Sequence, residues 1–237
     1  MTQRSAAAAD GGWIDISRPV ADGAAVWPGD PPWRYRLAAS IAGGDAANVG
    51  EVSGTTHTGT HVDAPFHVDA GGAAIDGLPL ETFVGPAVVV DVSADGDLIE
   101  SGHIEATLRR VAAAPGDIEA RARTADGYDR IERILLRTGC DWSSGFPGRW
   151  RSLSAEAAMW CGARGLRLVG TDAPSVDPAD SAALDAHRAL AASGVAILEN
   201  LALAGIEPGR YALVAFPLRW IGADASPVRA ALRRMEP

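Results

Sequence analysis

The chain has 237 residues, and its 21 basic side chains, every one an arginine, stand against 30 acidic ones, giving a formal charge of −9. This acidic balance argues against a nucleic-acid or anionic-membrane partner, and a chain without lysine cannot use a Schiff-base or Walker-A lysine. With 47% hydrophobic and 22% charged residues, the composition is that of a globular protein that needs no disulfide or structural metal in order to fold.

Short apolar runs alternate with helical patterns along the chain. Residues 1–12 contain only a brief alanine run and predict a flexible N-terminal tail. Apolar runs bounded by Gly, Pro or Asp predict strands over residues 87–92, 134–137, 166–169, 195–198 and 211–216. Start and stop signals predict helices over residues 101–114, 154–164 and 181–193, and a weakly patterned polar stretch at 109–128 predicts a surface insertion. Together they predict one strand-rich α/β domain over residues 13–237, with mixed sheets and packed helices.

The cysteines and the hydropathy pattern bear on the compartment. Cys140 and Cys161 are far apart and form no C-x-x-C pair, so a disulfide framework is not expected. No window contains the ~18 uninterrupted apolar residues of a membrane-spanning helix. We therefore expect a soluble cytoplasmic protein that binds neither membrane nor nucleic acid.

Three of the five histidines fall within eleven residues, in the sequence HTGTHVDAPFH. The polar members of this segment are His57, His61, Asp63 and His67. Gly59 and a nearby proline disfavour a helix, whereas an extended chain would direct these odd-numbered side chains to one side. Because imidazole and carboxylate are preferred ligands of Zn, Mn and Fe(II), the segment predicts a metal site rather than hydrogen-bonded core histidines.

Two residues further along the chain add to this set. Glu199 directly follows the apolar run 195–198, and a carboxylate at the end of a buried strand is costly unless it is paired or bound to metal. The alternative is that Glu199 merely begins a loop. His187 lies within the helix predicted for 181–193, and on its own it would be interpreted as structural. Asp172 also ends a predicted strand, but its neighbours predict a turn.

The motif at residues 57–67 resembles the signature of the cyclase-like metal-dependent hydrolases, which include the bacterial kynurenine formamidases. Further segments resembling this family are residues 26–30 (VWPGD), 170–178 (GTDAPSVDP), 198–201 (LENL) and 224–231 (DASPVRAA). The resemblance therefore extends from about residue 13 to the end of the chain. It implies a swivelling β/β/α fold and a homodimer.

Carried over position by position, the resemblance also implies a site built around two divalent ions. Zinc is the first choice of metal and manganese the second. The implied ligands are His57, His61 and Asp63 for the first ion, with Asp63 and Glu199 reaching both ions and His187 completing the second. His67 would be the proton shuttle, and Trp27 would form a wall of the substrate pocket.

The implied reaction is hydrolysis of a small aromatic amide, N-formyl-L-kynurenine, to L-kynurenine and formate in tryptophan breakdown. An alternative within the same chemistry is the hydrolysis of isatin or another cyclic amide. A more distant alternative is a non-haem Fe(II) oxygenase, whose triad of two histidines and one carboxylate matches His61, Asp63 and His187. That triad leaves His57 and Glu199 unexplained. A non-catalytic metal-binding or interaction protein is the remaining alternative, and it would not need His67.

Overall fold

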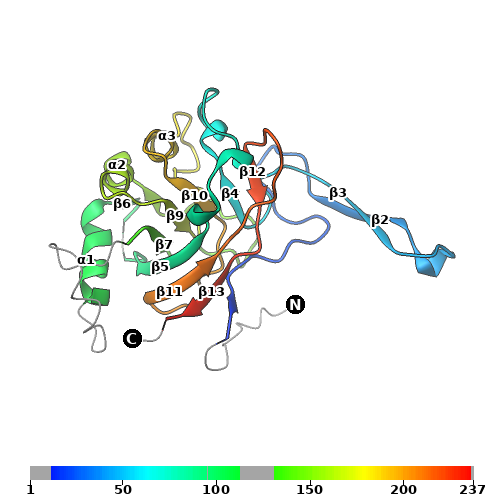
Figure 1. Ribbon diagram of the computed structural model, residues 1–237, viewed down its shortest axis with the longest axis horizontal. Coiled ribbons are helices and arrows are strands. Elements are labelled where there is room, and N and C mark those ends of the chain that lie inside the picture. The colour runs from blue at the N-terminus through cyan, green and yellow to red at the C-terminus, as the bar shows by residue number, and fades with distance from the viewer. Residues whose placement is uncertain (1–11, 95, 113–130, 236–237) are drawn as a thin grey trace.

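The computed structural model describes residues 12–94, 96–112 and 131–235, and a mixed nine-stranded sheet forms its centre (Figure 1). The sheet order is β1-β13-β11-β5-β7-β9-β10-β4-β12. Its strands are β1 (Ile14–Asp15), β4 (His61–Asp63), β5 (Val84–Asp91), β7 (Arg133–Arg137), β9 (Leu168–Thr171), β10 (Ala196–Glu199), β11 (Gly209–Val214), β12 (Ala225–Pro227) and β13 (Ala231–Arg234). The helices described are α1 (Ser101–Ala112), α2 (Ala155–Ala163) and α3 (Asp185–Ala192).

The shorter elements lie around this sheet. Two small two-stranded sheets pair β2 (Arg34–Ala39) with β3 (Val49–Ser53), and β6 (Leu98–Ile99) with β8 (Ser152–Leu153). Single turns of 3₁₀ helix are η1 (Ile41–Gly43), η2 (Pro65–His67), η3 (Ile75–Gly77) and η4 (Leu80–Thr82).

The middle of the large sheet is parallel and its two flanks are antiparallel. Strands β5, β7, β9 and β10 run parallel to one another, whereas β4 and β12 on one side and β11, β13 and β1 on the other are antiparallel. Parallel strands are covered on both faces, so their sequences are continuously apolar. In β5, Val88 and Val90 belong to one core cluster and Ala87 and Val89 to the other, as alternation along a strand requires.

The three helices gather along one side of the sheet (Figure 1). Ile104 of α1, Cys161 of α2 and Leu190 of α3 are buried in the same cluster as Val88 and Val90. The second cluster, on the opposite face, includes Phe83, Tyr211 and Leu232. The sheet is thus the wall between two apolar cores, and α3 is the helix that packs against β10.

The prediction of a strand-rich mixed α/β fold is confirmed, and each of the five predicted strands corresponds to a strand with shifted ends. The helix predicted for residues 181–193 begins later, at Asp185. Ser181 does accept a hydrogen bond from the Leu184 N–H, but the first N–H groups of α3 donate to Asp177, which lies outside the local pattern. A cap supplied from a distance is not visible in the local sequence.

Two predicted segments fall mainly on residues that the structure does not describe. Of the tail at 1–12 only Gly12 is described, and of the insertion at 109–128 only residues 109–112, which are the last residues of α1. Among the described residues no helix is long and apolar enough to cross a membrane. The cytoplasmic location stays a prediction.

The hairpin of β2 and β3 extends away from the rest of the molecule (Figure 1). We call it the arm, residues 34–53. Every residue of its two strands except Ala39 is exposed, and its apolar side chains Tyr35, Leu37, Val49 and Val52 are 44–58% exposed. A lone two-stranded hairpin is only marginally stable in water. A row of exposed apolar side chains on such a hairpin is typical of a surface that contacts another molecule.

Candidate metal centre and cavity

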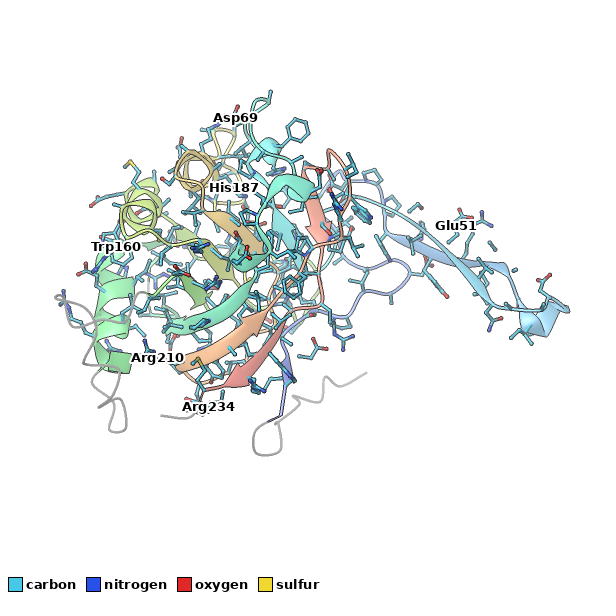
Figure 2. The ribbon with its side chains drawn as sticks, viewed as in Figure 1. Glu51, Asp69, Trp160, His187, Arg210 and Arg234 are labelled. Carbon is cyan, nitrogen blue, oxygen red and sulfur yellow. The ribbon has the colours of Figure 1, made fainter. Side chains whose placement is uncertain are left out.

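Two antiparallel strands bring the polar side chains together beneath α3. Strand β4 pairs with β10 in a register that sets His61 opposite Glu199 and Asp63 opposite Ile197. Residues opposite each other project from the same face of a sheet. That face lies toward α3, from which His187 reaches the sheet (Figure 2). His61, Asp63, His187 and Glu199 are all at most 4% exposed.

Each of three imidazoles is held by an acceptor on one ring nitrogen. The pairs are His57 Nε2 with Asp224 Oδ2 at 2.9 Å, His61 Nδ1 with the Gly59 carbonyl oxygen at 2.9 Å, and His187 Nδ1 with Asp177 Oδ2 at 2.6 Å. A ring N–H that donates to such an acceptor leaves the opposite nitrogen unprotonated in the neutral ring. This is the arrangement that fixes the tautomer and orientation of metal-binding histidines.

The opposite nitrogens of these rings all face one carboxylate. His57 Nδ1 and His61 Nε2 lie 3.0 and 3.3 Å from Asp63 Oδ1, and His187 Nε2 lies 3.5 Å from Asp63 Oδ2. Glu199 completes the group, since its Oε2 is 3.6 Å from His61 Nε2 and its Oε1 is 3.3 Å from His187 Nε2. Five donor groups therefore converge on one buried point.

The donor atoms at this point lack ordinary hydrogen-bond partners. His61 Nε2 and both carboxylate oxygens of Asp63 are buried without a hydrogen bond among the described residues. Leaving buried polar atoms unpaired costs about 1–3 kcal/mol each, and more for charged groups. Lone pairs of imidazole and carboxylate aimed at a common centre fit a transition-metal ion, so these residues could hold one or two divalent cations.

The charges in the cluster also favour a bound cation. Burial alone would raise the pKa of Asp63, but His61 and His57 hold it well below its usual range. Burial alone would lower the pKa of His57, yet Asp63 and Asp224 raise it to about 10. The buried carboxylate is thus ionised and requires positive charge beside it, from imidazolium protons or from a metal that replaces them.

His67 lies at the edge of the cluster. Its ring centroid is 4.3 Å from that of His57 and 5.6 Å from that of His187, and its Nδ1 is 3.7 Å from Asp224 Oδ2. Burial lowers the pKa of His67, with His57 and His187 acting in the same direction against Asp63 and Glu199. A neutral imidazole here can accept a proton, although the spacing of His57, Asp63 and His67 would also permit a metal.

The prediction that residues 57–67 form one extended segment is wrong. Only His61–Asp63 form a strand, and Gly59 turns the chain before it with φ +70°. The backbone angle at Gly59 favours glycine, and a Cβ there would also have to displace the Val20 side chain. Beyond β4 the 3₁₀ turn Pro65–His67 returns His67 to the group. Two turns, and not strand alternation alone, bring these side chains together.

The cluster of candidate metal ligands opens into a cavity of ≈ 510 Å³, a volume within the range of small-molecule binding sites. His57, His61, His67, His187 and Glu199 line it on one side. Trp27, Trp142 and Phe146 also line it, with ring centroids 5.6 Å apart for Trp27 and Phe146 and 5.7 Å apart for Trp142 and Phe146. These edge-to-face contacts form an aromatic wall that suits a flat aromatic ligand.

Several residues of this site were not assigned a role from the sequence. Asp177 and Asp224, which orient His187 and His57, lie in segments quoted for the family resemblance, but no spacing indicated their partners. Trp142 and Phe146 lie in the segment between β7 and β8, and no sequence pattern there indicates a cavity wall. Asp172 lies outside the cluster, and its carboxylate accepts hydrogen bonds from the Thr138 N–H and hydroxyl and from the Gly139 N–H. It therefore holds the loop after β7, instead of the turn of its own neighbours that the sequence indicates.

Asp177 offers a direct test of how His187 is held. Asp177→Asn is expected to lower metal affinity by about 10–100-fold, because the carboxylate accepts from both the backbone N–H and Nδ1 of His187. The measurement is metal titration by isothermal calorimetry. Ser181→Ala is the control, since the Ser181 hydroxyl accepts from the Leu184 N–H and not from His187, so its loss should leave metal affinity unchanged. Unchanged affinity in Asp177→Asn would contradict the role.

Comparison of the chain with known proteins identifies its family. The family model "Cyclase" matches residues 14–178. The chain belongs to the Cyclase family. A kynurenine formamidase of Salinibacter ruber is 42% identical over 223 residues, which cover 93% of this chain and 96% of the relative. A kynurenine formamidase of Bacillus cytotoxicus is 39% identical over 222 residues, with coverage of 93% and 97%.

Solved structures share the fold over nearly the whole chain. A potential metal-dependent hydrolase with cyclase activity superposes with a TM-score of 0.74 at 27% identity, over 95% of this chain and 99% of that chain. A protein described as a predicted metal-dependent hydrolase from Bacillus stearothermophilus gives a TM-score of 0.73 at 26% identity, over 96% of this chain and 100% of that chain. Isatin hydrolase A from Labrenzia aggregata gives 0.75 at 24% identity, over 94% of each chain, and shares the fold.

Proposed function

We propose that the chain is a kynurenine formamidase, which hydrolyses N-formyl-L-kynurenine to L-kynurenine and formate. The observation that carries the proposal is the buried cluster of three imidazoles and two carboxylates opening into an aromatic-walled cavity. The relationship to full-length kynurenine formamidases at about 40% identity supports it. In the reaction, water adds to the formyl carbonyl carbon, the C–N bond breaks, and the aryl amine leaves with a proton.

We assign the metal ligands to His57, His61, Asp63, His187 and Glu199. Two divalent ions are proposed, zinc first and manganese second, because one ion with a facial triad would leave two of the five converging donors unused. When bound, such ions lower the pKa of a water molecule and polarise a carbonyl oxygen. The chain's own part is to fix the three rings through Asp224, Gly59 and Asp177.

His67 is proposed to move the proton, and Trp27 to position the substrate. His67 lines the cavity beside the ligand cluster and could accept a proton from the attacking water and deliver it to the departing nitrogen. Trp27 would contact the substrate's ring, an interaction worth about 1 kcal/mol beyond its area burial. The Val176 N–H donates to Glu199 Oε1 at 2.8 Å, which holds this carboxylate in place.

The lowered pKa of His67 predicts the acid limb of the activity. Only neutral imidazole accepts a proton, so kcat/KM is expected to fall as the pH decreases through the pKa of His67, with a midpoint below about 6.5. A cation bound nearby would move this midpoint further down. The measurement is kcat/KM between about pH 5 and pH 8, with bound metal counted at each pH. An acid limb centred above pH 7 with full metal content would contradict it.

The proposed function is tested by one assay on metal-reconstituted protein. Formation of kynurenine is followed by absorbance, with and without chelator, and metal is counted on the same sample. Rapid, chelator-sensitive turnover with close to two ions per chain is the expected result. A fully loaded protein that leaves formylkynurenine intact would overturn the proposed substrate, and isatin is the comparison substrate in the same assay.

We also propose that residues 13–237 form one swivelling β/β/α domain. The pairing of β1 with β13, which joins the two ends of the chain in the same sheet, supports a single domain. The similarity to solved structures over nearly the whole chain supports it as well.

We propose that the protein is a homodimer, because the arm exposes apolar side chains. The exposed Tyr35, Leu37, Val49 and Val52 would gain cover from a second copy of the chain, whereas the arm has no core of its own. Glu51, drawn on the arm, lies far from the body of the molecule (Figure 2). A second copy is the natural occupant because the arm belongs to every copy, so two copies can exchange the same contact.

Light scattering on the purified protein tests this. Twice the chain mass of 24.5 kDa is expected for the native chain, and the mass of one chain for Val52→Glu, which places a charge on the arm. Met159→Glu is the control, since Met159 is 56% exposed on α2 away from the arm. A native chain of 24.5 kDa in solution would contradict the dimer.

A further inference from the structure

Two charged residues in the cavity have no role in the metal cluster or in proton transfer. The ionisable side chains lining the cavity are Arg18, Asp30, His57, His61, His67, His187 and Glu199. The four other histidine and glutamate side chains of the cluster and His67 have proposed roles as metal ligands and proton shuttle. Arg18 and Asp30 have none, and they place one positive and one negative charge in a cavity whose other wall is aromatic.

Arg18 is a rigidly held cation. Its Nη2 donates to the backbone carbonyl oxygens of Asp172 at 3.1 Å and Leu201 at 2.9 Å, and its guanidinium carbon lies 4.1 Å from the centroid of the Trp142 ring. Trp142 is fixed in turn, because its Nε1 donates to the same Asp172 carbonyl oxygen at 3.0 Å. A guanidinium clamped between a ring and two carbonyls loses little entropy when it binds a ligand.

The guanidinium keeps donors to spare. Of its five N–H groups, only those on Nη2 have hydrogen-bond partners among the described residues, and Nε is buried without one. Burial lowers the pKa of Arg18 to about 10, so the group stays charged at neutral pH. Arg18 forms no ion pair among the described residues, although the Asp172 carboxylate lies near enough to offset part of its charge. A partly desolvated arginine facing a cavity favours an anionic ligand group, above all a carboxylate.

Asp30 supplies the opposite charge from a different segment. It lies in the same loop as Trp27, and its backbone N–H donates to the Trp27 carbonyl oxygen at 3.0 Å. Its carboxylate has no hydrogen bond or ion pair within the described part of the chain. Arg18 does not neutralise it, because the contacts of Arg18 are with backbone carbonyls and Trp142.

We propose that Arg18 and Asp30 bind the α-carboxylate and the α-ammonium group of the substrate's amino-acid end, and so select a zwitterionic formamide over neutral amides. The inference rests on the proposed function and deepens it. The formyl end of the substrate would lie at the cluster around Asp63, its ring along Trp27 and Phe146, and its charged end at the two residues of opposite sign. Isatin and simple formanilides have neither charge and would gain nothing from them.

Three substrates separate recognition from structure. They are N-formyl-L-kynurenine, its des-amino analogue that keeps only the carboxylate, and ortho-formamidoacetophenone, which has neither charge. Arg18→Met is expected to lower kcat/KM by about 10–100-fold for the first two, mostly through KM, and to leave the third unchanged. Asp30→Asn should lower it for the first substrate alone. Arg18→Lys keeps the charge and should restore part of the loss.

The outcomes test the role of Arg18 and Asp30 separately from the proposed formamidase function. An equal loss of kcat/KM on all three substrates in Arg18→Met would make Arg18 a structural clamp and overturn the inference, while the formamidase function would stand. A native chain that cleaves the neutral amide as well as the zwitterion would overturn it too. If the native chain cleaves none of the three, the proposed function fails and this inference with it. Arg110→Met, an exposed arginine on α1 outside the cavity, is the matched control and should change none of the values.

Discussion

Replacing His67 with alanine is expected to lower kcat by about 10²–10⁴-fold while the bound metal stays nearly constant. The expectation rests on position: His67 lines the cavity and touches the cluster through its ring contacts with His57 and His187. It also rests on protonation, because burial holds its pKa below the ordinary value and leaves the ring able to accept a proton. The measurements are steady-state kinetics and metal counting on one preparation.

The matched control is His103→Ala. His103 lies at the start of α1, where its Nδ1 accepts from the Glu100 N–H, and it does not line the cavity. Its loss should leave kcat unchanged. Loss of metal in His67→Ala would contradict the shuttle role and make His67 a ligand, which the spacing of His57, Asp63 and His67 permits.

Replacing Asp63 with asparagine is expected to remove metal binding and, with it, turnover. Asp63 is the carboxylate that all three imidazoles face, and neither of its oxygens has a hydrogen bond among the described residues. Asparagine keeps the size but not the charge that offsets a buried cation. Metal affinity should fall by more than about 100-fold, the upper end of what an outer contact costs.

Thermal unfolding gives a readout of Asp63→Asn that does not depend on turnover. A metal at about 100 times its Kd stabilises the native chain by ~2.7 kcal/mol, and the variant should show no such gain. Asp172→Asn is the control, because Asp172 is equally buried at the end of β9, but its carboxylate accepts hydrogen bonds from Thr138 and Gly139 and is not part of the cluster. A full metal-induced shift in Asp63→Asn would contradict the assignment of Asp63 as a ligand.

Local patterns sufficed for much of the fold. The run at 87–92 predicted β5 because a parallel strand between two cores must be apolar on both faces. Ser154 predicted the start of α2, and its hydroxyl does accept from the Ala157 N–H. The start of α3 was missed by four residues because its cap, Asp177, is distant from the helix start.

The candidate metal ligands could be identified from the sequence, because buried imidazole and carboxylate groups at short spacing have few roles other than metal binding. The residues that orient these ligands could not be identified in this way. Asp224 reaches His57 only because β12 pairs with β4, and a sequence separation of 167 leaves no periodic signal. The same holds for Arg18, whose contacts with Asp172 and Leu201 span 154 and 183 residues.

Residue chemistry and local periodicity are properties of short stretches of chain, so the acidic charge, the strand and helix runs and the ligand types were readable before folding. Orientation and ionisation are properties of contacts made across the whole molecule. Which nitrogen of His187 faces Asp63 depends on Asp177, and the pKa of His67 depends on how deeply packing buries it. Only the tertiary structure decides these, because burial and long-range contacts exist only after β4, β10 and α3 have come together.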